Sequence, residues 1–416
     1  MTLDLISFDA ALKELYTDQV VQDMVYKKNP FFALVPKDEG FYGDGYPQPI
    51  KYGNPQSRSA TFSRAQARSL AENTKLKKFF LTRVHDYCIA TIDNETMEAS
   101  ENNKGAFMKA ATTEIDGAIG SLTRSVAIAL YGNGYGAIGR IATSSFAVTT
   151  LTLTQIQDIT NFEVGMELDL AVSDSSGTLK AYGSSGNGLI ITGVNRSAGT
   201  LTFGFNVNDA TNGIPTIAVN DYIFPRGDRQ NAASPDRLRI SGLDGWLPTS
   251  NPTSSLFFGV DRTSDVTRLG GLRLDISALP IEEGVIECAA LVGREGGSPS
   301  HMFINHGKYS DLEKALGSKV VYSDHKVGNI GFRGIRVIGP NGDIDVIPDQ
   351  NCPYNKGYML QLDTWTLRSL GKAIKVINSD GLKMLRQATA DGVEIRYGGY
   401  FQLGCEAPGW NLAAIM

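Results

Sequence analysis

The chain has 416 residues, 42% of them hydrophobic and 20% charged, which is enough material for two or three domains with separate cores. Its net charge of −5 is mildly negative and provides no field that would hold a polyanion, so wholesale binding of DNA or RNA is not expected. No run approaches the roughly 18 apolar residues of a membrane span. The acidic start MTLDLISFDAALKEL also lacks the basic region of a secretion signal.

The cysteines are far apart in the sequence, and none belongs to a C-x-x-C pair. This spacing favours neither a zinc site nor a disulfide framework. We therefore expect free thiols in a reducing cytoplasm. The residues concerned are Cys88, Cys288, Cys352 and Cys405.

Residues 1–45 are expected to form an N-terminal arm. Apolar residues recur at helical spacing until Asn29-Pro30 ends the pattern. The following stretch, FYGDGYPQPIKYGNP, is rich in Gly, Pro and Tyr and predicts extended chain and turns. The helical pattern consists of Leu12, Leu15, Val20, Val21 and Met24.

Residues 46–92 predict one long β-hairpin. YPQPIKYG supplies one strand and KLKKFFLTRVHDYCIATI the other, with a short helical stretch in the polar segment between them. A long hairpin is marginal in isolation, so it needs a surface to lie on. Eight basic residues face only Glu72 between positions 51 and 83, so an acidic neighbour would suit this surface.

Residues 93–140 contain the longest helix signal. Asp93 is a candidate N-cap, and Glu95 and Glu98 fall in the first turns, where the helix dipole favours negative charge. The pattern predicts a helix over 93–131, about 58 Å long at 1.5 Å per residue, with Gly132 ending it. Its apolar stripe is Met108, Ala111, Ile115, Ile119, Leu122, Val126 and Ala129.

Residues 141–228 are rich in Thr, Ser and Gly and alternate short strands with turns, which predicts an inserted small β-barrel or sandwich. VGMELDL and VNDYIF have the pattern of strand starts. The aromatic residues of this segment are expected in its core rather than on a sugar-binding platform. They are Phe162, Tyr182, Phe203, Phe205 and Tyr222.

Residues 229–375 and 376–416 alternate helices and strands, predicting an α+β fold, mostly antiparallel and without a β-α-β series. SALPIEEGVIECAALVGREGG predicts a helix. SHMFINHGKYSDLEKALG predicts a strand and then a helix capped at Ser310 or Asp311. Two hairpins are expected, turning at Pro340-Asn341-Gly342 and at Asp391-Gly392.

Two short motifs could be mistaken for chemistry. His85, Asp86 and Cys88 lie within four positions, but in a strand His85 and Cys88 point to opposite faces. We interpret these three residues as the end of a strand that leads into a helix. GYGAIG, at 134–139, matches G-x-G-x-x-G but follows a helix instead of a strand, so we expect a flexible exit from that helix.

The remaining candidates for metal binding are also weak. His301 and His306 would lie on opposite faces of a strand. Asp343, Asp345 and Asp349 offer fewer oxygen ligands than calcium needs, which favours a solvated face. There is no G-x-S-x-G, H-E-x-x-H or Walker loop, so the sequence predicts no catalytic residue, no cofactor and no metal.

The order of these parts resembles the major capsid proteins of tailed phages, with the Hong Kong ninety-seven type fold. The resemblance spans nearly the whole chain except 141–225, and no single motif is diagnostic. The passages that carry it are FFLTRVHDYCIATIDNETMEAS leading into KAATTEIDGAIGSLTRSVAIALYGNG, then GLDGWLP, MFINHGKYSDLEKAL, IRVIGPNGDIDVIPD, GYMLQLDTWTL and RYGGYFQLGCEAPGWNLAAI.

The resemblance implies a non-enzymatic shell subunit with an N-terminal arm, an extended hairpin loop, a peripheral-domain spine helix, an axial domain over 229–375 and return strands after it. In that family the extended loop lies over a neighbouring subunit of a hexamer or pentamer. The implied contacts join basic residues of the loop to acidic residues at the start of the spine. They are Arg58, Arg64, Arg68, Lys75, Lys77 and Lys78 on one side, and Glu95, Glu98 and Glu101 on the other.

Further partners follow from the same resemblance. Because the arm begins almost at Met1, we expect a separate scaffolding protein, or a chain that already lacks such a region, rather than a built-in scaffolding region. A portal, a cement or decoration protein and DNA packaged without sequence specificity complete the implied partners, with no membrane. The implied location is the virion, assembled in the host cytoplasm. Two alternatives stay open: an encapsulin-like compartment, and a tail-associated or glycan-binding protein working through 141–225.

Overall fold

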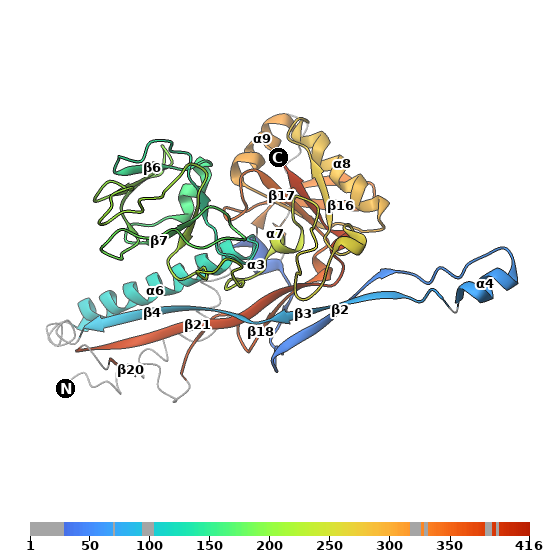
Figure 1. Ribbon diagram of the computed structural model, residues 1–416, viewed down its shortest axis with the longest axis horizontal. Helices are drawn as coiled ribbons and strands as arrows, with labels where there is room; N and C mark the ends of the chain where they lie inside the picture. Colours follow the sequence, from blue (N-terminus) through green and yellow to red (C-terminus); the bar gives the residue numbers. More distant parts are fainter. Residues whose placement is uncertain are drawn as a thin grey trace. The chain divides into compact units, whose positions relative to one another are not determined.

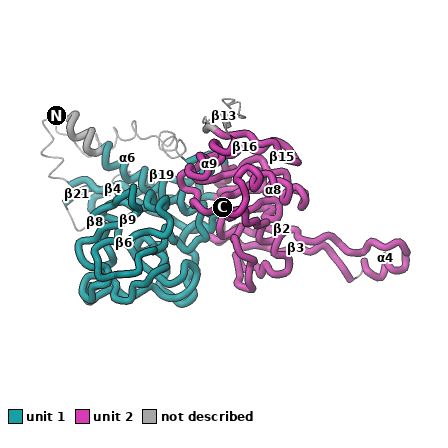
Figure 2. The backbone as a smooth tube through the Cα atoms, turned by 90° about the horizontal axis from the view of Figure 1, so that it is seen from above, with its two compact units in different colours: residues 1–34, 84–242, 369–401 teal, residues 35–83, 243–368, 402–416 magenta. Residues whose placement is uncertain are grey.

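The computed structural model describes residues 29–69, 71–93, 104–316, 326–327, 332–378, 385–387 and 391–416. Over these residues the chain is α+β, as the sequence predicts. It divides into two compact units, each built from three stretches of chain (Figure 2). Unit 1 comprises 1–34, 84–242 and 369–401, and unit 2 comprises 35–83, 243–368 and 402–416. The finer division into six segments stays a prediction.

Unit 1 is organised around the long helix α6 (Lys104–Ala129), which packs on strand β4 (Val84–Asp93). β4 pairs antiparallel with β21 (Gly392–Cys405), and Figure 1 shows α6 running along this pair. The 26 residues of α6 correspond to about 39 Å. The first residues of the predicted helix, 94–103, lie outside the described part of the chain. Of the predicted stripe on α6, Ile115, Ile119, Leu122, Val126 and Ala129 are buried, whereas the side chains of Met108 and Ala111 lie outside the described part of the chain.

The second strand of the predicted hairpin is divided in two, which corrects the prediction. Only β3 (Lys75–Thr82) pairs with β2 (Gly45–Gly53), while β4 pairs with β21. The break falls at Arg83, whose guanidinium donates to the carbonyl of Phe41 (2.8 Å) and lies 5.5 Å from its ring centroid. β4 has an apolar face of its own, so it is better stabilised under α6 than in a two-stranded hairpin.

The segment after α6 forms a six-stranded antiparallel sheet in the order β5-β10-β7-β8-β9-β6. A bridge between Ile141 and Leu153 joins its two ends, so the sheet closes into a small barrel. The strands predicted at VGMELDL and VNDYIF are β7 and β10, which pair with each other. Phe162 and Phe203 are buried in the barrel core and Tyr182 and Phe205 pack against it, as expected, whereas the Tyr222 ring lies beside the guanidinium of Arg140 (5.1 Å) and is not part of this cluster. The strands are β5 (Gly139–Arg140), β6 (Thr150–Thr152), β7 (Glu167–Ala171), β8 (Leu189–Asn195), β9 (Thr200–Phe203) and β10 (Tyr222–Pro225).

The centre of unit 2 is a mixed sheet in the order β11-β22-β17-β12-β16-β15. Helices α8 (Ile281–Arg294) and α9 (His306–Leu316) pack against it and against each other. Buried side chains of the two helices and the sheet form one core. The strands are β11 (Leu272–Asp275), β12 (His301–Ile304), β15 (Ile335–Gly339), β16 (Gly342–Pro348), β17 (Lys356–Leu360) and β22 (Leu412–Ile415).

One prediction for this unit is wrong in detail. Helix α9 begins at His306 and is capped by Asn305, whose side-chain oxygen accepts the N–H of Gly307 (3.0 Å), so neither Ser310 nor Asp311 is its cap. β12 pairs in parallel with β16, but both α9 and β15 lie between them in the sequence, so this pair does not form a β-α-β series. Three of the four β12 residues are buried, so this short strand carries no alternation from which its direction could be predicted.

The other local predictions agree with the structure. The α8 helix is present, and β15 and β16 turn at Pro340-Asn341. β20 pairs with β21 as the second predicted hairpin, although part of its turn lies outside the described residues. The GYGAIG segment is a loop between α6 and β5, with positive φ angles at Gly134 and Gly136.

The smaller described elements complete the chain. In unit 1 they are α3 (Pro30–Leu34), η1 (Ile156–Asn161), β19 (Lys375–Val376) and β20 (Leu385–Arg386). In unit 2 they are β1 (Lys37–Asp38), α4 (Phe62–Ser69), α7 (Leu243–Trp246), η2 (Thr263–Asp265), β13 (Lys326–Val327), β14 (Phe332–Arg333), η4 (Leu362–Thr364), β18 (Trp365–Ser369, whose last residue belongs to unit 1) and η5 (Pro408–Trp410).

Candidate functional site: the β2–β3 hairpin

Strands β2 and β3 form a two-stranded sheet whose register runs from Gly45 opposite Thr82 to Gly53 opposite Lys75. Among the described strands, β2 pairs with β3 alone. Pro47 and Pro49 within β2 have no backbone N–H, so they cannot donate to another strand. The hairpin therefore contacts the rest of the protein through its side chains and through the backbone of β3.

The base of the hairpin is anchored in unit 2. Phe79 and Leu81 on β3 are fully buried, and the Phe79 ring centroid lies 5.3 Å from that of Trp246. The N–H of Phe80 donates to the carbonyl of Phe258 (3.0 Å). Unit 2 therefore supplies, at the base of the hairpin, part of the surface that the hairpin needs.

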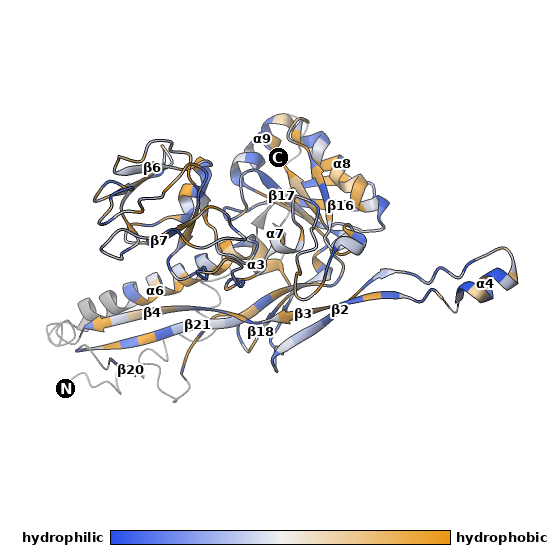
Figure 3. Cartoon of the chain, viewed as in Figure 1, coloured by the Kyte–Doolittle hydropathy of each residue, from blue (hydrophilic) through white to orange (hydrophobic). Residues whose placement is uncertain are grey.

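The tip of the hairpin, which we define as residues 54–74, has the opposite character. No described residue of the tip is buried, and Phe62, the first residue of α4, is 81% exposed. Figures 1 and 2 show α4 at the far end of the hairpin, away from the rest of unit 2, and Figure 3 shows hydrophilic and hydrophobic residues mixed along it. Nε of Arg68 donates to the carbonyl of Gln56 (3.0 Å) and ties α4 to the outgoing chain.

The structure places the six predicted basic residues on this one hairpin. Arg58, Arg64 and Arg68 belong to the tip, and the three lysines lie on β3. Nζ of Lys75 pairs with Glu72 (3.1 Å), whereas Arg58, Arg64 and Lys78 form no ion pair with any described residue. The predicted acidic partners Glu95, Glu98 and Glu101 lie outside the described residues, so their pairing with Lys75, Lys77 and Lys78 or with the arginines stays a prediction.

The hairpin carries charge of the opposite sign to the rest of the chain. Its eight basic residues and one acidic residue between 51 and 83 leave 31 basic against 43 acidic residues elsewhere. An exposed positive projection on a negative chain favours contact with another copy of the same chain.

A second polar centre, in unit 1, was missed by sequence analysis. Arg239 is 8% exposed and lies 2.8 Å from a carboxylate oxygen of Asp86 and 3.6 Å from one of Asp228. Its guanidinium also donates to Ser125, which donates to Asp86 (2.8 Å). Asp86 is therefore the counter-ion of a buried arginine. It is the third residue of the ten-residue strand β4, so the interpretation of this cluster as the end of a strand is wrong.

Burial and charge act against each other in this centre. Burial raises the pKa of Asp228 to about 6; Arg239 opposes this shift and Asp86 adds to it. Burial alone would lower the pKa of Arg239, but the carboxylates of Asp86 and Asp228 more than offset this effect and raise it. Such a group of charges holds the strand β4, the helix α6 and the chain after the barrel together.

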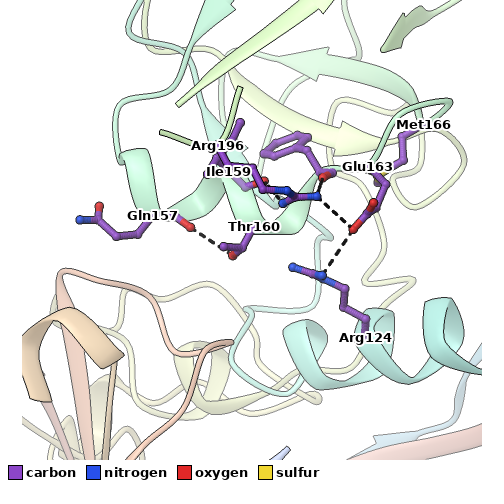
Figure 4. Close-up of polar contacts among 8 residues, drawn as sticks. Arg124, Gln157, Ile159, Thr160, Glu163, Met166 and Arg196 are labelled. Carbon is purple, nitrogen blue, oxygen red and sulfur yellow. Dashed lines mark hydrogen bonds and ion pairs between the residues drawn. The ribbon is translucent and has the colours of Figure 1, made fainter. Parts of the chain in front are cut away.

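A cavity of about 590 Å3 adjoins this centre, between the C-terminal half of α6 and the barrel. At its rim Glu163 accepts from two arginines, Arg124 of α6 at 3.5 Å and Arg196 of the barrel at 3.3 Å (Figure 4). Arg196 also donates to the carbonyls of Ile159 and Phe162. These contacts are partly exposed, so they fix geometry more than they contribute stability.

The candidates for metal and thiol chemistry do not converge. His301 lies in β12 and His306 begins α9, so the premise that both lie in one strand was wrong. Arg336 bridges Asp343 and Asp345 at 3.2 Å each, while Asp349 is buried and accepts from Asn351. Within the described chain no three potential ligands gather around a common point. The four cysteines are free thiols, as expected.

None of the described helices is long and apolar enough to span a membrane.

Comparison with known proteins gives likeness in structure alone. The chain matches no protein-family model and no curated protein. A chain of the capsid asymmetric unit of cyanophage A-1(L) is 12% identical, with 94% of this chain and 93% of that chain covered at a TM-score of 0.47. A chain of Mycobacterium phage Ogopogo is 9% identical, with 93% and 92% covered at 0.43. A chain of the virus-like particle from Pyrococcus furiosus is 8% identical, with 95% and 96% covered at 0.41. These values assign neither family nor function.

Proposed function

We propose that this chain is the major capsid protein of a tailed phage, a structural subunit that assembles into hexamers and pentamers of an icosahedral shell around double-stranded DNA. The order of its elements supports the proposal. An extended hairpin, a long helix on a strand pair and a separate mixed sheet with two helices follow one another as in the family that the sequence resembles.

The observation that carries the proposal is the hairpin tip. The tip has 21 residues, and none of those described is buried. It carries an exposed Phe62 and three arginines, so it is not stabilised by burial within its own chain. The base of the same hairpin is held rigidly by Phe79 and Trp246. A rigid base and an unburied, charged tip are what an arm needs if it is to lie on a neighbouring subunit.

The proposed partner of the six basic residues is acidic surface on the next subunit. Glu95, Glu98 and Glu101 at the start of the spine are the first candidates, on the strength of their charge and of the family resemblance. Replacing Lys75, Lys77 and Lys78 by Glu should prevent normal shells. Recovery of normal shells from this variant would rule out that contact.

The remaining partners belong to the same proposal. They are a separate scaffolding protein, a portal, a cement protein and DNA packaged without sequence specificity. Assembly in the host cytoplasm and residence in the virion follow from this role. The net charge of −5 fits a shell wall that does not bind its genome tightly.

The decisive experiment is negative-stain electron microscopy with sedimentation velocity on the purified chain, alone and co-expressed with its scaffolding partner. Closed shells, capsomer rings or curved sheets are the expected result. A monodisperse monomer under both conditions would overturn the proposal and direct attention to glycan binding by the barrel.

A further inference from the structure

A groove of about 820 Å3 lies in unit 2 along the strand β2. Three carboxylates line it, each from a different stretch of chain: Glu295 after α8, Asp363 in η4 and Glu406 after β21. The indole of Trp410, 41% exposed, forms part of the same wall. The groove thus combines negative charge with an accessible aromatic surface.

The groove's own basic residues leave this negative charge largely available. Arg268 also lines the groove, but its guanidinium donates to the carbonyl of Tyr52 (2.8 Å) and lies 3.9 Å from Asp265. Lys51, the other basic lining residue, is exposed on β2.

The pairs that the carboxylates form within the chain are long. Glu295 lies 3.5 Å from Arg294, and Glu406 lies 4.0 Å from Arg368. Pairs of this length between partly exposed groups contribute little to stability, so a better-placed cation could replace them.

The hairpin tip has the complementary chemistry. Arg58 and Arg64 are exposed and form no ion pair with the described chain, and Phe62 between them is 81% exposed. A guanidinium stacks favourably on an indole and pairs with carboxylates in two-point contacts. We propose that the tip of one copy binds in the acidic groove of a second copy, with Arg58 and Arg64 meeting the carboxylates and Phe62 or an arginine covering Trp410.

The tip cannot easily reach the groove of its own chain. The groove borders β2 and Asn54, the first residue of the tip, whereas α4 lies at the far end of the hairpin (Figures 1 and 2). The hydrogen bond from Arg68 to Gln56 holds α4 against the outgoing chain. A second copy is therefore the favoured occupant.

This inference rests on the proposed shell function and adds a geometric consequence. Tip and groove are different surfaces of one chain, so the contact is head-to-tail, and repeated contacts of this kind close into rings when the rotation permits. Arg58 and Arg64 would then pair with the groove of a neighbour around the capsomer instead of with the start of the spine, whereas the lysines of β3 keep Glu95, Glu98 and Glu101 as their first candidates.

Chemical crosslinking between two variants that each carry one accessible cysteine tests the contact directly. Cys88→Ser removes the one native cysteine that is not buried, and Arg64→Cys or Asp363→Cys is added to it. Mixed and co-assembled, the two variants treated with a short bis-maleimide should give a crosslinked dimer, at least ten-fold more than either variant alone. A dimer yield equal to that of Cys88→Ser alone would overturn the proposal.

Charge reversal gives an independent test. Arg58→Glu with Arg64→Glu, or Asp363→Lys with Glu406→Lys, should each reduce assembled material at least ten-fold, and the four changes together should restore much of it. Glu283→Lys with Glu287→Lys, on the exposed face of α8, is the matched control and should assemble normally. Circular dichroism of each variant establishes that it folds.

The outcomes separate the two proposals. Wild-type chain that stays monomeric overturns the shell function and this contact with it. Wild-type shells together with normal assembly of the groove variant overturn the contact alone. Loss of assembly in the α8 control but not in the groove variant would also overturn the contact between tip and groove. A tip variant that forms shells but no longer retains a DNA duplex would overturn this contact too, because the tip would then bind nucleic acid.

Discussion

Arg239 neutralises two carboxylates that would otherwise be buried without a counter-charge. Arg239→Ala should therefore lower the free energy of unfolding by about 3–5 kcal/mol, because Asp86 and Asp228 stay behind unpaired. Arg140→Ala is a suitable control, since the Arg140 side chain is exposed and contacts the carbonyl of Asn220 and the ring of Tyr222 instead of a buried carboxylate. Urea titration followed by circular dichroism measures both. Equal, small losses would contradict the central role of Arg239.

Asp228 should make stability depend on pH. Its folded pKa of about 6 lies above the ordinary value of 3.8, so the folded chain holds a proton that the unfolded chain has lost between these values. The stabilisation is complete below about pH 4 and is lost as the pH rises through 6. Asp228→Asn should thus leave the free energy of unfolding unchanged at pH 4 and raise it by about 1–3 kcal/mol at pH 8.

The control for this pH effect is Asp236→Asn, an exposed carboxylate on the same stretch of chain. It should change the free energy of unfolding little at either pH. Urea titrations of both variants at pH 4 and pH 8 provide the comparison. A gain for Asp228→Asn that is equal at the two pH values would mean that the effect is not a proton equilibrium.

This polar centre could not be predicted from the sequence. Asp86 and Arg239 are more than 150 positions apart, and no local pattern marks either as buried. What the sequence did reveal was the facing of β4: His85 is exposed, whereas Asp86 and Cys88 are half-buried on the other side. Alternation is a local property and can be read from neighbours, while an ion pair depends on how distant segments pack.

At the scale of elements, mutations on the two faces of β3 should lower the free energy of unfolding by different amounts. Phe79 is fully buried against Trp246, so Phe79→Ala should lower the free energy of unfolding by about 3–5 kcal/mol. Its neighbour Phe80 is 42% exposed, so Phe80→Ala should cost well under half as much. Thermal unfolding of both variants makes the comparison. Similar losses would mean that the hairpin base is not anchored as described.

The cap of α9 offers a second matched pair. Asn305→Ala removes the acceptor for the Gly307 N–H and the donor to the Cys352 carbonyl, so it should cost about 1–2 kcal/mol of folding stability. Ser310→Ala, at the cap position that the sequence favoured, should cost almost nothing because Ser310 lies inside the helix. Denaturant midpoints measure the difference. The reverse order would restore the sequence-based assignment.

Elements with strong periodicity or turn residues were predicted well. The described part of the apolar stripe of α6, the helix α8 and the Pro340-Asn341 turn all agree with the structure. The main error concerns a partner: β4 leaves the hairpin for β21. Pairing is decided by burial of both faces of a strand, which a single segment does not encode.

At the scale of the whole molecule, assembly should protect the tip from proteolysis. Trypsin should cut the unassembled chain first after Arg58, Arg64 and Arg68, because the tip has no buried described residue. In assembled material these sites should be cut at least ten-fold more slowly. Mass spectrometry of the early fragments measures both rates. Equal cleavage in the two states would mean that the tip stays uncovered after assembly.

Charge separation along the chain has a further effect on assembly. Contacts between an exposed basic tip and exposed carboxylates are screened at ionic strengths where the Debye length falls to a few Å. Raising the salt from about 0.1 M to 1 M should therefore disperse capsomers, while the unfolding temperature changes little because both units have apolar cores. Sedimentation velocity and thermal unfolding follow the two effects separately.

Pro47 and Pro49 bear on what happens to the chain before it meets its neighbours. A newly made subunit accumulates at high concentration, and an unpaired strand edge is then a template for runaway sheet growth into fibrils. By removing two backbone donors from β2, the prolines make that edge a poor template while leaving its side chains available. Selection on such a chain would act on the waiting time between synthesis and incorporation as well as on the finished particle.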